Sequence, residues 1–168
     1  MKNFAAALLV SFGLAGCLGY HVGPVKPAYL SEIRVISVPT FKNSTLLPRV
    51  EVLITGTVIK QLQQDGTYKI GNDNNADAIL QGEVIKISRS PARSVRGNVL
   101  ATTEFNLSIH VRYKLVDRSG KQLGPQGEAG GTTSFFVGTD VTTDERQALP
   151  LATEELATRL VSQLSEGW

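Results

Sequence analysis

The clearest pattern in the chain is a strict alternation of apolar and polar residues over residues 104–115. The apolar positions are Phe105, Leu107, Ile109, Val111, Tyr113 and Leu115, and the polar ones are Glu104, Asn106, Ser108, His110, Arg112 and Lys114. Successive side chains of a strand point to opposite faces, so this pattern predicts a long strand with one buried and one exposed face. We expect the apolar face to pack beneath helices.

Shorter apolar stretches predict four more strands. Residues 33–38 are rich in β-branched side chains and are apolar on both faces, whereas 68–70 form a brief strand before a turn. Residues 78–87 form a strand whose apolar parity shifts near Gly82, which indicates a bulge there. Residues 127–137 give a further strand with a weaker pattern.

Apolar residues at helical spacing predict a helix after Pro48 that ends at Gly66. Its apolar positions are Val50, Leu53, Ile54, Val58 and Leu62. Asn43 or Thr45 could cap this helix, and Pro48 is tolerated in a first turn. Several β-branched residues and a glycine between 52 and 59 have poor helix propensity, so a strand remains the alternative for this segment.

A second helix is predicted from Thr143 to the end of the chain, with acidic residues in its first turn. Its apolar stripe consists of Leu149, Ala152, Leu156, Leu160 and Leu164. Pro150 should kink this helix or mark its true first turn. The resulting order, β–α–β–β–β–β–α, predicts an α+β fold: a two-layer sandwich in which two helices pack on one face of a mostly antiparallel, four- to five-stranded sheet.

Composition narrows the class of protein. The chain has 168 residues, of which 42% are apolar and 19% charged, as expected for one folded domain rather than a disordered chain. Its net charge of +2 argues against a dedicated nucleic-acid binder. One cysteine and two histidines exclude an internal disulfide and make the usual zinc site untenable. The sequence has none of the common catalytic or nucleotide-binding motifs, so we expect no catalytic residues, metal or cofactor.

The N-terminus reads as an export signal. Lys2 precedes a short apolar segment, residues 4–13, which is too short to span a membrane. Leu14-Ala15-Gly16-Cys17 then matches a bacterial lipobox, in which the cysteine thiol receives the lipid. The alternative for Cys17 is a buried free cysteine. We therefore expect a signal peptide over 1–16, a lipidated tether over 17–30 and a single domain over 31–168. The residue after Cys17 is not aspartate, which fits the outer membrane.

The strongest local candidate for ligand binding is a basic cluster. Lys86, Arg89, Arg93 and Arg96 lie within eleven residues with no acidic residue among them, in a segment, 88–98, that reads as a hairpin loop. Arg112 and Lys114 on the next strand could extend this cluster. Arginine suits phosphate because its planar guanidinium donates two parallel hydrogen bonds. The alternatives are an ordinary solvated loop, or arginines that touch acidic loops of a partner protein.

Taken together, these segments resemble the LptE family of lipopolysaccharide-assembly lipoproteins. The resemblance rests on the order of five short motifs behind the lipobox and on the C-terminal helix. The motifs lie at residues 19–21, 33–35, 41–45, 65–68 and 76–84. It implies a non-enzymatic, lipid-anchored outer-membrane protein that faces the periplasm, plugs and helps to assemble the LptD β-barrel and binds lipopolysaccharide.

Two other functions remain open. Another envelope lipoprotein, such as a curli-secretion-like subunit of a secretion complex, could share the Ala-Asp…Leu-x-Gly pattern of residues 76–82. A lipid-anchored hydrolase would need a nucleophile and base that the sequence does not display.

Overall fold

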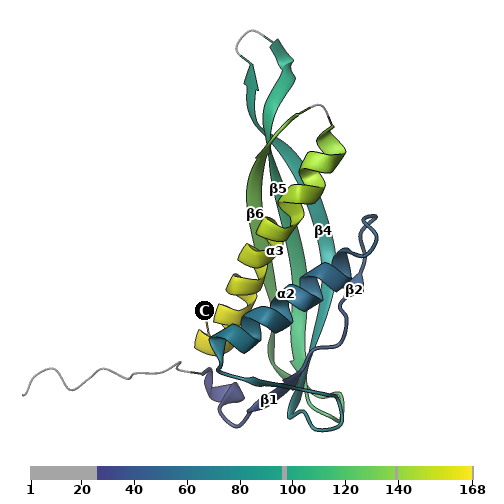
Figure 1. Ribbon diagram of the computed structural model, residues 1–168. Helices are drawn as coiled ribbons and strands as arrows, with labels where there is room; N and C mark the ends of the chain where they lie inside the picture. The colour runs from purple at the N-terminus through teal and green to yellow at the C-terminus, as the bar shows by residue number, and fades with distance from the viewer. Residues whose placement is uncertain (1–25, 96–97, 139, 168) are drawn as a thin grey trace, which may run out of the picture.

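The computed structural model describes residues 26–95, 98–138 and 140–167, and for residues 93–95 and 98–103 the backbone alone. The predicted signal peptide, Cys17, most of the predicted tether and Arg96 lie outside the described residues. Two helices lie on one face of a long, twisted sheet (Figure 1). The elements are η1 (Ala28–Leu30), β1 (Val35–Ser37), β2 (Lys42–Asn43), α2 (Val50–Asp65), β3 (Lys69–Gly71), β4 (Ala78–Val95), β5 (Asn98–Val116), β6 (Gln122–Phe136) and α3 (Val141–Glu166).

The sheet is mixed, not mostly antiparallel as predicted. Its order is β3-β1-β4-β5-β6, and β2 pairs with β4, which gives six strands. The long strands β4, β5 and β6 are antiparallel neighbours, whereas β1 runs parallel to both β3 and β4, and β2 runs parallel to β4. Parallel pairing needs a crossover connection, and the segment that contains α2 makes it between β1 and β3. The predicted α+β class and the two-layer arrangement are confirmed.

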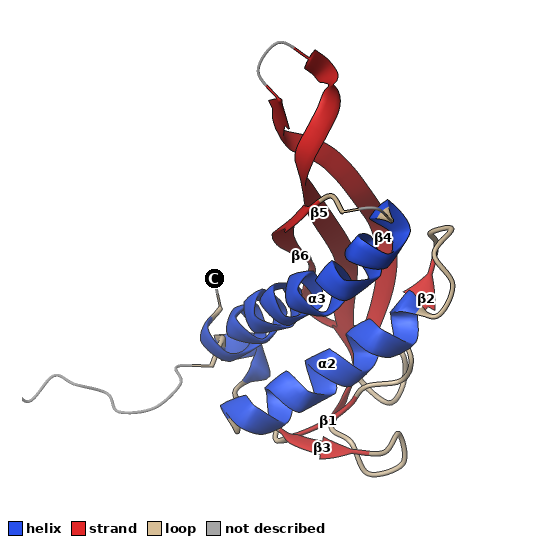
Figure 2. Ribbon diagram, turned by 45° about the horizontal axis from the view of Figure 1, so that its top comes forward, coloured by secondary structure: helices blue, strands red, loops and turns tan. Residues whose placement is uncertain are grey.

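The alternating strand and its buried face are confirmed. Leu107, Ile109 and Val111 of β5 are fully buried on the side that faces the helices. Helix α3 contacts β5 and β6, and α2 packs beside α3 in the same layer (Figure 2). The opposite face of β4, β5 and β6, called the helix-free face below, has no helix over it in the described structure.

Residues 88–98 do not form the predicted hairpin loop. Strand β4 continues to Val95 and β5 starts at Asn98, so the hairpin projects as a ribbon beyond the helices (Figure 1). Pro91 is accommodated because the β4–β5 register shifts after it, as expected where a strand lacks a neighbour on its other side. The register shift lower in β4 lies between Val84 and Lys86, not at Gly82. Gly82 instead admits the ring of Phe41, which lies 2.5 Å from where its Cβ would be.

Helix α2 is confirmed, and the strand alternative for this segment is wrong. It ends at Gly66, whose φ of 75° allows the left-handed C-cap that glycine favours. The predicted N-cap is not used, because Arg49 occupies that position without a side-chain cap. Asn43 instead builds the preceding turn: its Oδ1 accepts a hydrogen bond from the Thr45 amide (2.9 Å) and its Nδ2 donates to the Leu47 carbonyl (2.8 Å).

Helix α3 begins two residues before the predicted start. The Asp140 carboxylate caps it by accepting hydrogen bonds from the amides of Thr142 (3.0 Å) and Thr143 (3.4 Å). Pro150 lies inside the helix and does not end it. All five residues of the predicted apolar stripe are buried. The stripe therefore packs α3 onto the sheet as expected.

The last residues of the predicted tether pack against the domain. Leu30 in η1 is fully buried. The Lys26 ammonium donates a hydrogen bond to the Ile33 carbonyl (2.8 Å) and lies 4.6 Å from the centre of the Tyr68 ring. The chain is thus fixed from Lys26 onward, at the end of the molecule where α3 terminates (Figure 1).

Candidate functional site

A row of alternating charges crosses the helix-free face. Lys42, Glu83, Arg112 and Glu128 are register partners on β2, β4, β5 and β6. The Lys42 ammonium lies 3.6 Å from the Glu83 carboxylate, and Arg112 Nε donates to Glu128 Oε1 at 3.0 Å. Opposite charges directly across a sheet stabilise the pairing. The row thus fixes where these side chains point and leaves them balanced in charge.

Glu83 is held ionised within this row. A hydrogen bond from the Ser44 hydroxyl is the main cause that lowers the pKa of the Glu83 carboxyl, and the nearby Lys42 charge lowers that pKa further. The carboxylate thus remains negative at neutral pH. Because these groups are exposed to solvent, their ion pairs are weak and can be exchanged for a ligand.

A hollow of about 490 Å³ lies beside the row on the sheet. Lys42, Arg112 and Lys114 line it together with a single acidic residue, Glu83. Lys114 lies at the β5–β6 register shift between Tyr113 and Leu115 and forms no ion pair with any described residue. Its ammonium is therefore the uncompensated cation of the hollow. Three cations around one space can bind a phosphate or carboxylate group.

The structure brings together two of the six predicted ligand-binding residues. Arg112 and Lys114 share the hollow, as the alternation in β5 implied. Lys42 joins them and was missed by the sequence analysis, since a two-residue strand carries no detectable periodicity. Only its position in the motif at 41–45 could have drawn attention to it.

The predicted basic cluster is divided between the two faces of β4. Lys86 pairs with His110 on the helix-free face, whereas Arg89 pairs with buried Leu107 on the helix side. Arg89 Nη1 donates to the Glu145 carboxylate (3.0 Å), and its guanidinium lies 4.9 Å from the centre of the Phe105 ring. Arg89 therefore has an acidic partner that is distant in sequence. Arg96 and the side chain of Arg93 lie outside the described part of the chain.

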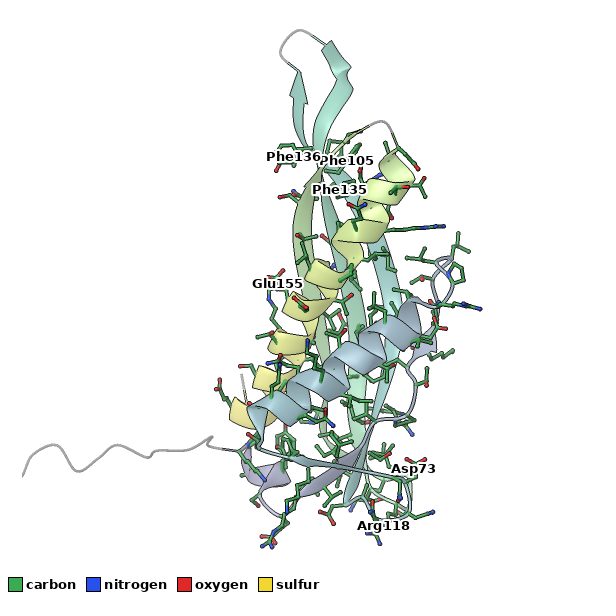
Figure 3. All side chains as sticks on the ribbon, in the orientation of Figure 1. Asp73, Phe105, Arg118, Phe135, Phe136 and Glu155 are labelled. Atoms are coloured by element: carbon green, nitrogen blue, oxygen red, sulfur yellow. The ribbon has the colours of Figure 1, made fainter. Side chains whose placement is uncertain are left out.

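Aromatic residues gather at the upper end of β6, below the projecting β4–β5 ribbon (Figure 3). The rings of Phe105 and Phe135 stack on the helix side with centroids 6.0 Å apart. Phe136, the last residue of β6, is 71% exposed. The helix-free face thus combines a charged row, a cationic hollow and an exposed aromatic ring at one end.

The charges on the helix-free face suit the binding of an anion. No group of three or more potential metal ligands is found among the described residues. In the same part of the chain, no helix combines the length and the apolar character needed to cross a bilayer. The unusual pKa values belong to carboxylates that accept structural hydrogen bonds and to two tyrosines; burial is the main cause that raises the pKa of Tyr68 and of Tyr113 to about 12.

Solved structures share the fold at low sequence identity. A dodecameric PelC point variant from Paraburkholderia phytofirmans aligns with a TM-score of 0.53 and 19% identity over 84% of this chain and 94% of PelC. A minor lipoprotein of Acinetobacter baumannii aligns with a TM-score of 0.57 and 18% identity over 79% of this chain and 93% of its own. At such identities these matches show the fold alone. No curated protein sequence gives a significant match.

A match to a protein-family sequence model identifies the family of this chain. The model of the LptE family, described as lipopolysaccharide assembly, matches residues 33–164, which include every element from β1 to β6 and most of α3. This family consists of non-enzymatic envelope lipoproteins, in agreement with the predicted absence of catalysis. The protein with this charged sheet face belongs to the LptE family.

Proposed function

We propose that this chain is an outer-membrane lipoprotein, anchored through acylated Cys17 and facing the periplasm. In this proposal it plugs and helps to assemble an LptD-like β-barrel and contacts lipopolysaccharide through the helix-free face. The observation that carries the proposal is the cationic hollow of Lys42, Arg112 and Lys114 on an open sheet face of an LptE family member. Lipid A and the inner core sugars carry phosphates and carboxylates that suit such a hollow.

The position of Lys26 supports the anchored arrangement. Eight residues lie between Cys17 and Lys26, so an extended chain between them reaches at most about 32 Å. Lys26 is fixed at the Tyr68 ring, and Pro27 approaches the C-cap Gly167 of α3. A lipid on Cys17 would thus hold this end of the domain near the membrane, with the β4–β5 ribbon at the far end. Two or three acyl chains suffice for stable anchoring.

Co-purification from outer membranes solubilised in detergent tests the partner. A stable complex with a much larger β-barrel protein is the expected result. A homo-oligomeric ring without a barrel would favour the alternative, a secretion-complex subunit; the PelC variant of similar fold is a dodecamer. Recovery of the protein alone would contradict both.

Binding to purified lipopolysaccharide tests the ligand. Lys42→Ala/Arg112→Ala/Lys114→Ala should weaken binding by an order of magnitude or more, since charge-assisted hydrogen bonds contribute roughly 1.5–3 kcal/mol each. Lys69→Ala, an exposed lysine on β3, is the matched control and should bind normally. A second variant, Lys86→Ala/Arg89→Ala/Arg93→Ala/Arg96→Ala, asks whether the predicted basic cluster contributes. Unchanged binding in both multiple variants would eliminate this face and this cluster as the glycolipid contact.

A further inference from the structure

The two long edges of the sheet, β6 and β4, differ in whether side chains satisfy their outward-facing backbone groups. At the β6 edge, side chains of α3 satisfy backbone groups: the Thr132 amide donates to Glu155 Oε2 (2.6 Å) and Gln163 Nε2 donates to the Glu128 carbonyl (3.3 Å). Glu155 is labelled in Figure 3, where α3 runs beside this edge. Such contacts protect an edge strand from pairing with another chain.

The β4 edge lacks such contacts beyond its pairing with β2, in the part of the chain that the structure describes. The last contact there is the Ser44 amide, which donates to the Val84 carbonyl at 3.0 Å. From Lys86 to Ser90, β4 pairs with β5 on one side and with no described strand on the other. The register shift below Lys86 and Pro91 above it limit this free edge to about five residues. An edge limited in this way suits one short added strand and resists open-ended pairing.

An apolar groove lies against this free edge. Two adjoining hollows of about 440 and 300 Å³ share Leu47 as a common wall. The first is lined by Ile85 and Ile87 of β4, and the second by Leu53 of α2 and Leu149 of α3. The remaining lining residues are Thr45, Leu46, Pro48, Val50, Lys86, Arg49, Glu145 and Arg146. We call this surface, together with Lys86–Ser90, the edge groove.

The side chains of the edge groove are apolar at its floor and basic at its rim. Leu46 is fully exposed at the lip, although leucine favours burial. Lys86, Arg49 and Arg146 are exposed and form no ion pair with any residue the structure describes. The only acidic lining residue, Glu145, is already paired with Arg89. The lining of the groove therefore carries three cations against one carboxylate, which Arg89 already pairs.

We propose that the edge groove binds an extended peptide segment of another protein, apolar at alternate positions and acidic at the others. The segment adds to β4 beside Lys86–Ser90. Its backbone pairs with the free edge, and its apolar side chains enter the groove beside Leu47 and Ile87 on the helix side. Its acidic side chains point to the helix-free side, where Lys86 lies, and Arg49 and Arg146 add positive charge around the groove. Main-chain hydrogen bonds supply affinity in such strand addition, and the pockets for alternate side chains supply specificity.

Charge complementarity and the free backbone edge together distinguish a peptide from a lipid. An acyl chain could fill the apolar floor, and an anionic headgroup could meet the cations, but neither can pair with backbone groups of a strand. The proposal goes beyond the proposed function, because it requires neither a glycolipid nor a particular barrel.

The test uses a synthetic fluorescent peptide, Glu-Val-Glu-Ile-Glu-Val-Asp, titrated onto the purified full chain in detergent. Binding should slow hydrogen exchange at the amides of residues 86–90. A peptide of the same sequence that is N-methylated at alternate positions cannot form the ladder and should bind at least tenfold more weakly. Its Lys-for-acid counterpart should not bind, because it would bring positive side chains to Lys86 and to a basic groove.

Charge-reversal variants test the site itself. Lys86→Glu/Arg146→Glu should weaken peptide binding at least tenfold, whereas Lys69→Glu on β3 should leave it unchanged. These residues are exposed, and melting curves check that each variant folds. Equal binding of the N-methylated peptide would overturn strand addition. Binding to phosphatidylglycerol vesicles that is lost in the double variant, with no binding of the peptide, would assign the groove to lipid and overturn the proposal. A lack of binding to both probes would also overturn it, without affecting the co-purification result above.

Discussion

At Gly131 the backbone of α3 lies against the sheet with no room for a side chain, so replacing this glycine by alanine should destabilise the fold. Gly131 is opposite Ile109 in the β5–β6 register and is buried on the helix side. A Cβ there would lie 1.9 Å from the Ala152 carbonyl oxygen and 2.5 Å from the Leu156 amide nitrogen. Atoms in contact normally lie roughly 3.5–4.0 Å apart. A single methyl group therefore forces α3 away from β6 by about 1 Å or more.

The size of this destabilisation depends on which atoms the added methyl group would clash with. Both are backbone atoms of a helix, so no side-chain rotation can relieve the clash. Overpacking a core costs typically about 1–3 kcal/mol, and the upper end applies because α3 carries fully buried Leu156 and Leu160 with it. Loss of glycine's freedom in the unfolded chain offsets roughly 0.4–1 kcal/mol. We expect Gly131→Ala to lower the free energy of unfolding by about 2 kcal/mol.

Urea unfolding of the purified protein measures this change in the free energy of unfolding, and substitutions at two other glycines serve as controls. Gly130→Ala places its Cβ on the other side of the strand, 3.3 Å from the exposed His110 ring and the Ile109 carbonyl, and should change stability by less than about 0.5 kcal/mol. Gly56→Ala in α2 meets nothing within 4 Å and should stabilise by roughly 0.5–1 kcal/mol. The reasoning is refuted if Gly131→Ala unfolds at the same urea concentration as the wild type with an unchanged m-value.

Three further predictions concern the core, pH and the anchor. Ile109→Ala should cost about 2–5 kcal/mol in denaturant melts because Ile109 is fully buried, whereas Arg112→Ala should cost under about 0.5 kcal/mol; equal costs would contradict the assignment of faces. Hydrogen bonds from the amides of Val35 (2.9 Å) and Arg34 (3.0 Å) lower the pKa of Asp77 in the folded protein. The Asp77 carboxylate therefore stabilises the fold fully above its unfolded pKa of about 3.9. This contribution is lost as the pH falls through the lower pKa of the folded state. Asp77→Asn should thus be less stable at neutral pH but converge with the wild type near about pH 2, and a gap that widens in acid would be inconsistent with this. Cys17→Ser should block acylation and leave the precursor uncleaved by mass spectrometry, and an unmodified wild-type protein cleaved elsewhere would disprove the lipobox reading.

Elements with a strong local period were predictable from the sequence. The alternation in β5 reports burial directly, since its apolar residues face the helix layer. The stripe from Leu149 to Leu164 does the same for α3. In α2 the apolar spacing outweighed poor propensity, because packing of Ile54, Val58 and Leu62 stabilises the helix more than β-branching weakens it.

Pairing that depends on distant residues was not predictable. Strand β2 has two residues, Lys42 and Asn43, and exists because β4 offers it a parallel edge. The parallel pairing of β1 with β3 likewise depends on the crossover through α2, not on any period within either strand. Residues 88–98 read as a loop because of Pro91 and Gly97, yet a ribbon that lacks a second neighbour tolerates a proline.

The charges of the candidate site show why a sequence cluster and a surface patch differ. Four cations within eleven residues look like one patch, but alternation along β4 separates Lys86 from Arg89, and Glu145 from the other end of the chain neutralises Arg89. In the hollow, an anionic ligand must displace Glu128 from Arg112, whereas Lys114 offers its charge without such competition. Lys114 should therefore contribute more to affinity for an anion than Arg112 does, although arginine is the better phosphate ligand in isolation.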